Sequence, residues 1–179
     1  MTTEMWIIAG ARLAGSLPVM RWPFYGAIVA ILVDQSDLFM MNLIHLGGVT
    51  DYQAFDKYLD QAYMLTFLIV ALRWQGAERK VAAGLYGYRM IGFVAFEFTR
   101  SRALLLAFPN LFEFWFLFVT GRRQFNLEQR LQGKAMGVTL AALVALKFFQ
   151  EYAIHHARWL DGFTAVEAVE AIWHWLTPF

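Results

Sequence analysis

The sequence contains no cysteine, which excludes disulfide bonds, thiolate metal sites, iron–sulfur clusters and cysteine nucleophiles. Charge is scarce too, because only 16% of the 179 residues are Asp, Glu, Lys or Arg and the net charge is +1. There is no basic run or basic patch interleaved with aromatic residues, so we expect no nucleic-acid partner. A glycine-rich phosphate loop, a Ser–His–Asp arrangement and a His-x-x-Glu-His motif are also missing, which leaves carboxylates and arginines as the candidate chemical groups.

Apolar residues are abundant, with 59% hydrophobic residues, 17% aromatic residues and a mean hydropathy of +0.45. A soluble domain of this size could not bury so much apolar surface, whereas a bilayer core is crossed by roughly 20 apolar residues in a helix. The composition therefore predicts an all-α, polytopic transmembrane helix bundle that forms one domain over residues 1–179 in the lipid bilayer. Other membrane subunits or a second copy of the chain are possible partners. About five spans are expected, at residues 22–45, 55–72, 81–98, 103–120 and 137–154.

Two flanking segments are amphipathic rather than apolar throughout. Residues 1–18 have Arg12 in the middle of an apolar stretch, and residues 163–176 place Glu167 and Glu170 opposite apolar side chains. This pattern is typical of helices that lie in the membrane interface. We therefore expect interfacial helices at both ends of the chain.

The distribution of Lys and Arg predicts the orientation of these spans. Nine of these residues lie in the N-terminal segment and in residues 73–80 and 122–134, which the five-span arrangement places on one side of the membrane. By the positive-inside rule that side is cytoplasmic. The N-terminus is then expected in the cytoplasm and the C-terminus on the opposite side.

The expected spans contain several ionisable residues. Asp34 and Asp37 lie one helical turn apart in the first span, and Asp56 and Asp60 lie one turn apart in the second. Two carboxylates within a membrane must share a proton, bind a cation or pair with arginine. Carboxylates on two facing helices can also supply the oxygen ligands that Mg²⁺, Mn²⁺ or Ca²⁺ prefers. The pattern thus predicts a cation or metal site formed by these four aspartates, opening toward the outer side of the membrane.

Other polar residues could support this site. Arg89 and Glu97 share a face of the third span, where they could form a structural or gating pair. Pro109 lacks a backbone donor and should kink the fourth span next to Asn110, leaving a carbonyl free to bind. The full set of supporting candidates for polar or phosphate contacts is His45, Arg89, Glu97, Arg100, Arg102, Asn110, Glu113 and Glu151.

The intervals between the four aspartates resemble those of CDP-alcohol phosphotransferases, which are membrane enzymes that use two metal ions to transfer a lipid head group. The resemblance covers residues 34–60. Glycine, alanine and arginine of the family motif are missing after the second aspartate, and a glycine is missing before the third. This sequence has Leu38, Met41, Asn42 and Tyr52 at those positions. The resemblance implies a metal-dependent reaction on a lipid phosphate.

Three functions fit these observations. The first is a carboxylate site that binds or conducts a cation or protons. The second is a metal-dependent enzyme acting on a lipid phosphate, in which the aspartates hold the metal and Arg100 and Arg102 hold the phosphate. The third is a small non-catalytic subunit of a larger membrane complex. The cost of burying so many ionisable groups favours the first.

Overall fold

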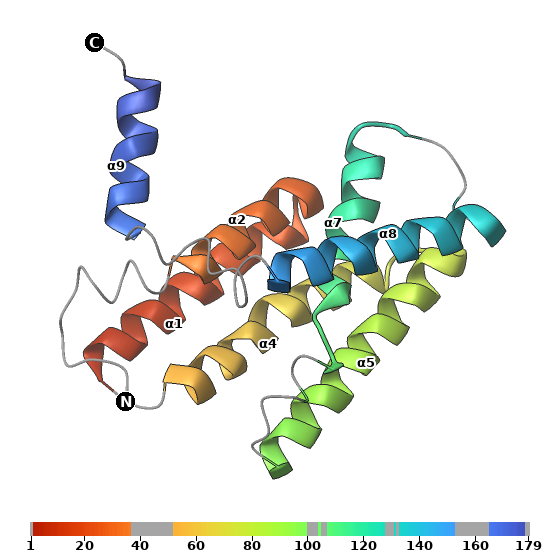
Figure 1. Cartoon of the computed structure of the whole chain (residues 1–179), viewed down its shortest axis with the longest axis horizontal. Helices are drawn as coiled ribbons and strands as arrows, with labels where there is room; N and C mark the ends of the chain where they lie inside the picture. Colours follow the sequence, from red (N-terminus) through yellow and green to blue (C-terminus); the bar gives the residue numbers. More distant parts are fainter. Residues whose placement is uncertain are drawn as a thin grey trace.

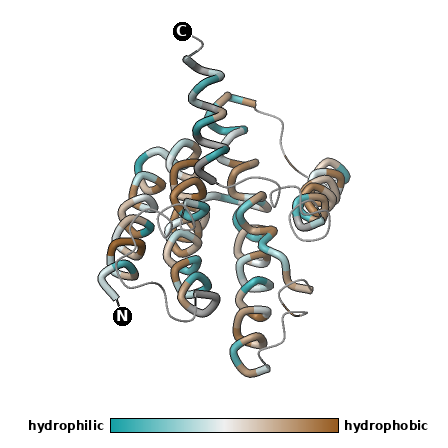
Figure 2. Tube along the Cα trace, turned by 60° about the vertical axis from the view of Figure 1, so that its left-hand side comes forward, coloured by the Kyte–Doolittle hydropathy of each residue, from teal (hydrophilic) through white to brown (hydrophobic). Residues whose placement is uncertain are grey.

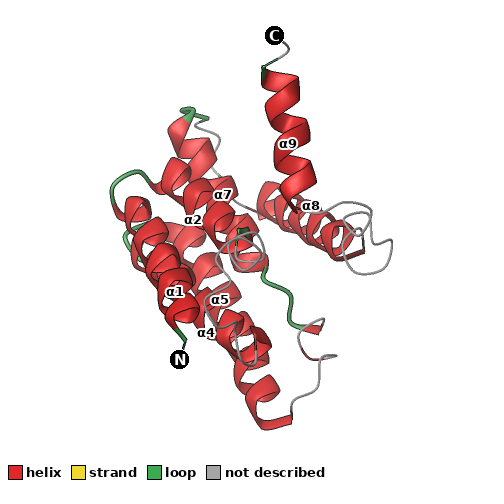
Figure 3. Cartoon of the chain, turned by 90° about the vertical axis from the view of Figure 1, so that its left-hand side faces the viewer, coloured by secondary structure: helices red, strands yellow, loops and turns green. Residues whose placement is uncertain are grey.

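The computed structural model describes residues 2–36, 52–99, 104, 107–127, 131, 133–152 and 165–177. Every regular element within these ranges is a helix, which confirms the all-α prediction (Figures 1 and 3). The elements are α1 (Thr3–Ser16), the 3₁₀ helix η1 (Leu17–Met20), α2 (Pro23–Gln35), α4 (Tyr52–Ala71), α5 (Gly76–Thr99), α7 (Leu111–Gln124), α8 (Gly133–Glu151) and α9 (Ala165–Leu176).

The first two helices form an antiparallel pair joined by η1. The side chain of Thr2 caps α1 by accepting a 3.2 Å hydrogen bond from the amide of Met5. Pro23 occupies the first turn of α2, where a missing amide hydrogen costs no helical hydrogen bond. Gly26 allows η1 to pack directly on α2, since a Cβ there would lie 2.3 Å from the backbone nitrogen of Val19. This close packing fixes the position of α1 on α2.

Aromatic side chains fill the core between α4 and α7. Phe67 stacks on Phe116 with ring centroids 4.2 Å apart, and Trp74 also stacks on Phe116, at 5.4 Å. Phe67, Phe116 and Trp115 are fully buried. Such rings combine a large buried area with favourable stacking, so they hold the two helices together.

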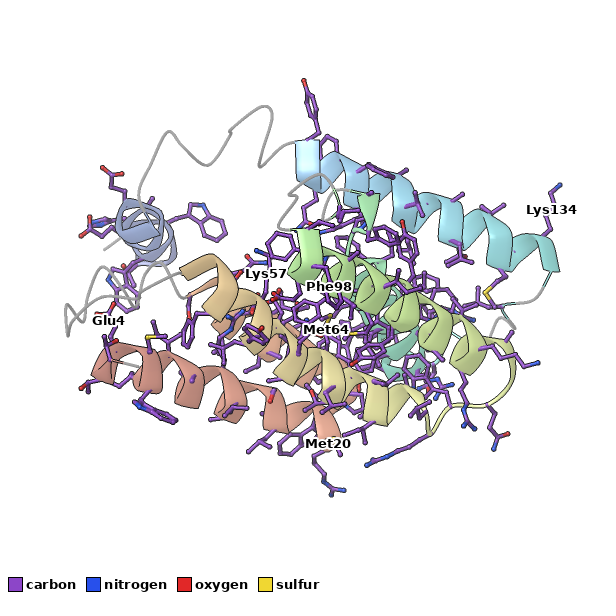
Figure 4. The ribbon with its side chains drawn as sticks, turned by 90° about the horizontal axis from the view of Figure 1, so that it is seen from below. Glu4, Met20, Lys57, Met64, Phe98 and Lys134 are labelled. Atoms are coloured by element: carbon purple, nitrogen blue, oxygen red, sulfur yellow. The ribbon has the colours of Figure 1, made fainter. Side chains whose placement is uncertain are left out.

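Successive helices run in opposite directions, so that the ends of α1, α4 and α7 and the starts of α2, α5 and α8 meet at one end of the bundle. The start of α2 lies against the end of α7, because the rings of Phe24 and Phe125 are 5.5 Å apart. The start of α5 reaches the same place, because Glu78 pairs with Arg122 and Arg123 of α7. The short turn from α4 to α5 and the start of α8 are also there. In Figure 4, Lys134 at the start of α8 and Glu4 of α1 lie at opposite ends of the molecule.

The prediction of one continuous helix over residues 103–120 is wrong. Residues 108–110 are not helical, and α7 begins only at Leu111, with Asn110 as its N-cap. Phe108 turns inward against Gly92 of α5, where a Cβ would approach its side chain to 2.3 Å. The ring of Pro109 and the capping side chain of Asn110 therefore break the helix instead of only kinking it.

The expectation that residues 1–18 form an interfacial helix also needs correction. Helix α1 packs against both α2 and α4 and buries Ile8, Arg12 and Ser16. Because α1 is antiparallel to α2, its first residue lies away from the end where the six helices meet. The N-terminus therefore lies at the end of the bundle opposite Lys134 (Figure 4), and Arg12 does not lie with the other basic residues with which the predicted orientation grouped it.

The helices differ in how apolar they are. Figure 2 shows mixed hydrophobic and hydrophilic residues along most of them. Among the described residues, one helix, over Gly133–Gln150, is long and apolar enough to cross a bilayer, while α2 is apolar but shorter. The other expected spans correspond to α2, α4, α5 and α7, although residues 37–45 of the first lie outside the described part. Helix α9 contacts none of the other described helices and exposes Trp173 and Trp175.

Candidate functional site

A buried arginine lies at the centre of the candidate site. Arg12 points from α1 into the space between α2 and α4, and only 2% of its side chain is exposed. Its Nη1 donates a 3.0 Å hydrogen bond to Oδ1 of Asp56 and a 3.4 Å bond to the backbone carbonyl of the same residue. Its Nη2 donates a 2.9 Å bond to Oδ1 of Asp60 and also pairs with Oδ1 of Asp34. One guanidinium therefore contacts three carboxylates.

The three aspartates come from two helices. Asp34 lies near the end of α2, whereas Asp56 and Asp60 lie one turn apart on α4 and so face the same way. Their side chains are 21%, 34% and 17% exposed, respectively. One carboxylate oxygen from each lies within 4.8 Å of the others, which is close enough for a shared cation. We refer to Arg12, Asp34, Asp56 and Asp60 as the carboxylate cluster.

The donor set of the carboxylate cluster fits a hard cation. Three carboxylates on two helices offer oxygen ligands only, which suits a proton, Mg²⁺, Mn²⁺ or Ca²⁺ better than a softer metal. The guanidinium of Arg12 lies among the same oxygens and already supplies one positive charge. An added metal ion would therefore share these oxygens with Arg12 or displace it.

A second polar group continues from the carboxylate cluster along α4. Tyr63 lies one turn after Asp60, and its hydroxyl donates a 3.1 Å hydrogen bond to Oε2 of Glu113 on α7. The amide nitrogen of Asn110 also donates to Oε2 of Glu113, at 3.1 Å, and to the Tyr63 hydroxyl, at 3.4 Å. Arg89 and Lys147 are close enough for their charges to act on Glu113. Two of the supporting candidates, Asn110 and Glu113, thus bind each other and link α4 to α7.

The proposed pair of Arg89 with Glu97 is absent from the described residues. Nη1 of Arg89 instead donates a 2.9 Å hydrogen bond to the carbonyl of Phe108, which the break before α7 leaves without a helical donor. Eight residues separate Arg89 from Glu97, which is about 12 Å along a helix, so a shared face did not bring them into contact. Arg89 therefore stabilises the helix break.

Asp37, His45, Arg100 and Arg102 lie outside the described residues, and so does the side chain of Glu151 at the end of α8.

Sequence reasoning missed the role of Arg12, although a signal was present. The buried face of α1 is formed by residues that recur at helical spacing, namely Glu4, Met5, Ile8, Ala9, Arg12 and Ser16. An arginine on such a face needs a carboxylate partner, because an unpaired buried charge is very costly. The identity of that partner could not be read from the sequence, since Asp56 and Asp60 are more than 40 positions away.

No protein-family model matches this chain, and neither the curated proteins nor the solved structures contain a significant match. The functional argument therefore depends on the residues and contacts described above.

Proposed function

We propose that this chain is a multi-pass helical membrane protein whose carboxylate cluster binds a cation, either a proton or a metal ion. The observation that carries the proposal is the imbalance of charge around Arg12. One guanidinium contacts three carboxylates, and the guanidinium is buried while the carboxylates are partly buried. Excess negative charge of this kind is neutralised in proteins by protonation or by a bound cation.

The carboxylates of the cluster still outnumber the cations when the second polar group is included. Counting Glu113 with the three aspartates, the network contains four carboxylates against the three cations Arg12, Arg89 and Lys147. One more positive charge would make it neutral. A single proton or monovalent ion would supply that charge, and a divalent ion would do so if Arg12 moved away.

The membrane part of the proposal is supported by α8 and by the alternation of helix directions. Apolar side chains of α8 such as Val138, Leu146 and Phe148 are exposed, as expected for a helix that faces lipid. Helices α2, α5 and α8 begin at the end of the bundle where α4 and α7 finish. Crossings by α2, α4, α5, α7 and α8 would produce this alternation, with that end in the cytoplasm and the tail after α8 on the other side. Helix α1 also finishes at that end, which puts the N-terminus on the same side as the tail.

Single cysteines test the five crossings, because the native chain has none. We expect cysteines replacing Gln75 and Gln124 to react with an impermeant maleimide from one side of sealed vesicles, and a cysteine replacing Thr177 to react from the other. Labelling after detergent permeabilisation controls for access. Reaction of all three positions from the same side would contradict five crossings.

Thermal unfolding of the purified protein tests the cation proposal. A cation that binds only the folded state raises the unfolding midpoint, by an amount equivalent to about 2.7 kcal/mol at 100 times its dissociation constant. We expect the native chain to respond to Mg²⁺, Mn²⁺ or Ca²⁺, or to acidification. The variant Asp34→Asn/Asp60→Asn should lose this response, because it leaves one carboxylate, Asp56, for one guanidinium.

The matched control is Glu78→Gln, which removes a paired carboxylate at the other end of the bundle and should leave the response unchanged. Equal responses from the native chain and the double aspartate variant would rule out the carboxylate cluster as the binding site. A metal response accompanied by chelator-sensitive turnover of a phospholipid would favour the enzyme alternative over simple binding.

A further inference from the structure

Basic side chains are concentrated at one end of the bundle, far from the carboxylate cluster. They come from four places: the junction of η1 and α2, the turn between α4 and α5, the last turn of α7 and the first turn of α8. We call this surface the basic end. Its members are Arg21, Arg73, Arg79, Lys80, Arg122, Arg123 and Lys134.

The positive charges of the basic end are opposed by very few acidic side chains. Glu78 is the one acidic residue among the described residues of these four segments. Its carboxylate is shared by Arg122, at 3.4 Å, and Arg123, at 2.6 Å. The other five cations are exposed, so the surface presents a strong positive charge to whatever lies beside it.

Exposed apolar side chains accompany this charge. Trp22 is 61% exposed directly after Arg21, Phe125 is exposed beside Arg123, and Leu72 is exposed before Arg73. Aromatic and apolar groups next to Lys and Arg, at one end of a bundle that contains a helix able to cross a bilayer, are typical of the level of the lipid headgroups.

We propose that the basic end binds the headgroups of anionic phospholipids. This inference uses the membrane orientation proposed above and does not depend on the carboxylate cluster. Lys134 lies in the first turn of the helix that is long and apolar enough to cross a bilayer, which places the basic end at the headgroup level. Each Lys or Arg near an anionic lipid surface changes the binding constant about fivefold.

The test measures lipid retention by the full-length protein in a nonionic detergent. The protein is mixed with phosphatidylglycerol or phosphatidylcholine, freed of unbound lipid, and its bound lipid is counted by native mass spectrometry. We expect preferential binding of phosphatidylglycerol that weakens with salt. The variant Arg73→Gln/Arg79→Gln/Lys80→Gln should lower the affinity for phosphatidylglycerol about 100-fold, because each of the three lost charges lowers the binding constant about fivefold.

The matched control, Arg73→Lys/Arg79→Lys/Lys80→Arg, keeps the charge and should retain the lipid. All three positions are exposed, and unchanged thermal midpoints would show that the variants fold. Equal retention of the two lipids, or an unaffected neutral variant, would overturn the proposal. So would stronger binding of inorganic phosphate or of a polyuridine oligonucleotide than of phosphatidylglycerol.

Failure of the cation proposal would be recognised separately. The variant Asp34→Asn/Asp60→Asn leaves the basic end intact and should bind phosphatidylglycerol as the native chain does.

Discussion

Arg12→Met should lower the free energy of unfolding by about 3 kcal/mol, because it removes the positive charge from three carboxylates that remain together. Methionine keeps most of the length and apolar surface of the arginine stem, so the loss reports mainly on charge. Chemical unfolding in detergent at neutral pH measures this decrease in the free energy of unfolding. The deficit should shrink as the pH falls, since protonation of the aspartates removes their mutual repulsion, and divalent cations should reduce it as well.

The control for Arg12→Met is Arg79→Met, at an exposed position, where a change within about 0.5 kcal/mol is expected. A loss in Arg12→Met that is the same at all pH values and in all cation solutions would show that Arg12 contributes packing and not neutralisation. Native stability of the variant would show that Arg12 is not buried against the aspartates.

Gly26→Ala should destabilise the protein by about 2–3 kcal/mol, although it adds only one methyl group. Its Cβ would lie 2.3 Å from the nitrogen of Val19 and 2.4 Å from the carbonyl carbon of Pro18, and these backbone atoms can move only if η1 moves. Moving η1 also shifts α1 on α2, and therefore Arg12 relative to Asp34. Thermal unfolding should show the loss of stability together with a weaker response to cations.

Gly84→Ala is the matched substitution, because Gly84 also lies within a helix but a Cβ there meets no atom within 4 Å. Alanine has the higher helix propensity, so this variant should be as stable as the native chain or up to about 1 kcal/mol more stable. If the two alanine variants behave alike, η1 does not pack on α2 as described.

The helical content of the chain could be predicted from its sequence because long apolar segments between polar connections have few alternatives. The predicted second, third and fifth spans begin within five residues of α4, α5 and α8, and the tail coincides with α9. The common face of Asp56 and Asp60 also followed from helical spacing, and the structure turns both toward Arg12.

Contacts between distant segments could not be predicted in this way. Arg12 appeared to be an interfacial residue because its partners lie on α2 and α4, and helical spacing contains no information about which helices are neighbours. The same limit explains why the partner of Arg89 was predicted wrongly. The prediction paired Arg89 with Glu97 on the same helix, whereas Arg89 donates a hydrogen bond to the carbonyl of Phe108, in the break before α7. The sequence predicted a kink at Pro109 rather than a break, and it did not predict the side chain that donates to the carbonyl exposed by the break.

Infrared spectroscopy of the carboxyl groups tests the cation proposal most directly. We predict that chelator-treated native protein at neutral pH has a protonated-carboxyl absorption that Asp34→Asn/Asp60→Asn lacks and that a bound divalent cation removes, since a metal ligand must be deprotonated. Identical spectra for the two proteins, unchanged by Mn²⁺ or by Ca²⁺, would mean that the cluster takes up neither a proton nor a metal ion, and would contradict the proposed function.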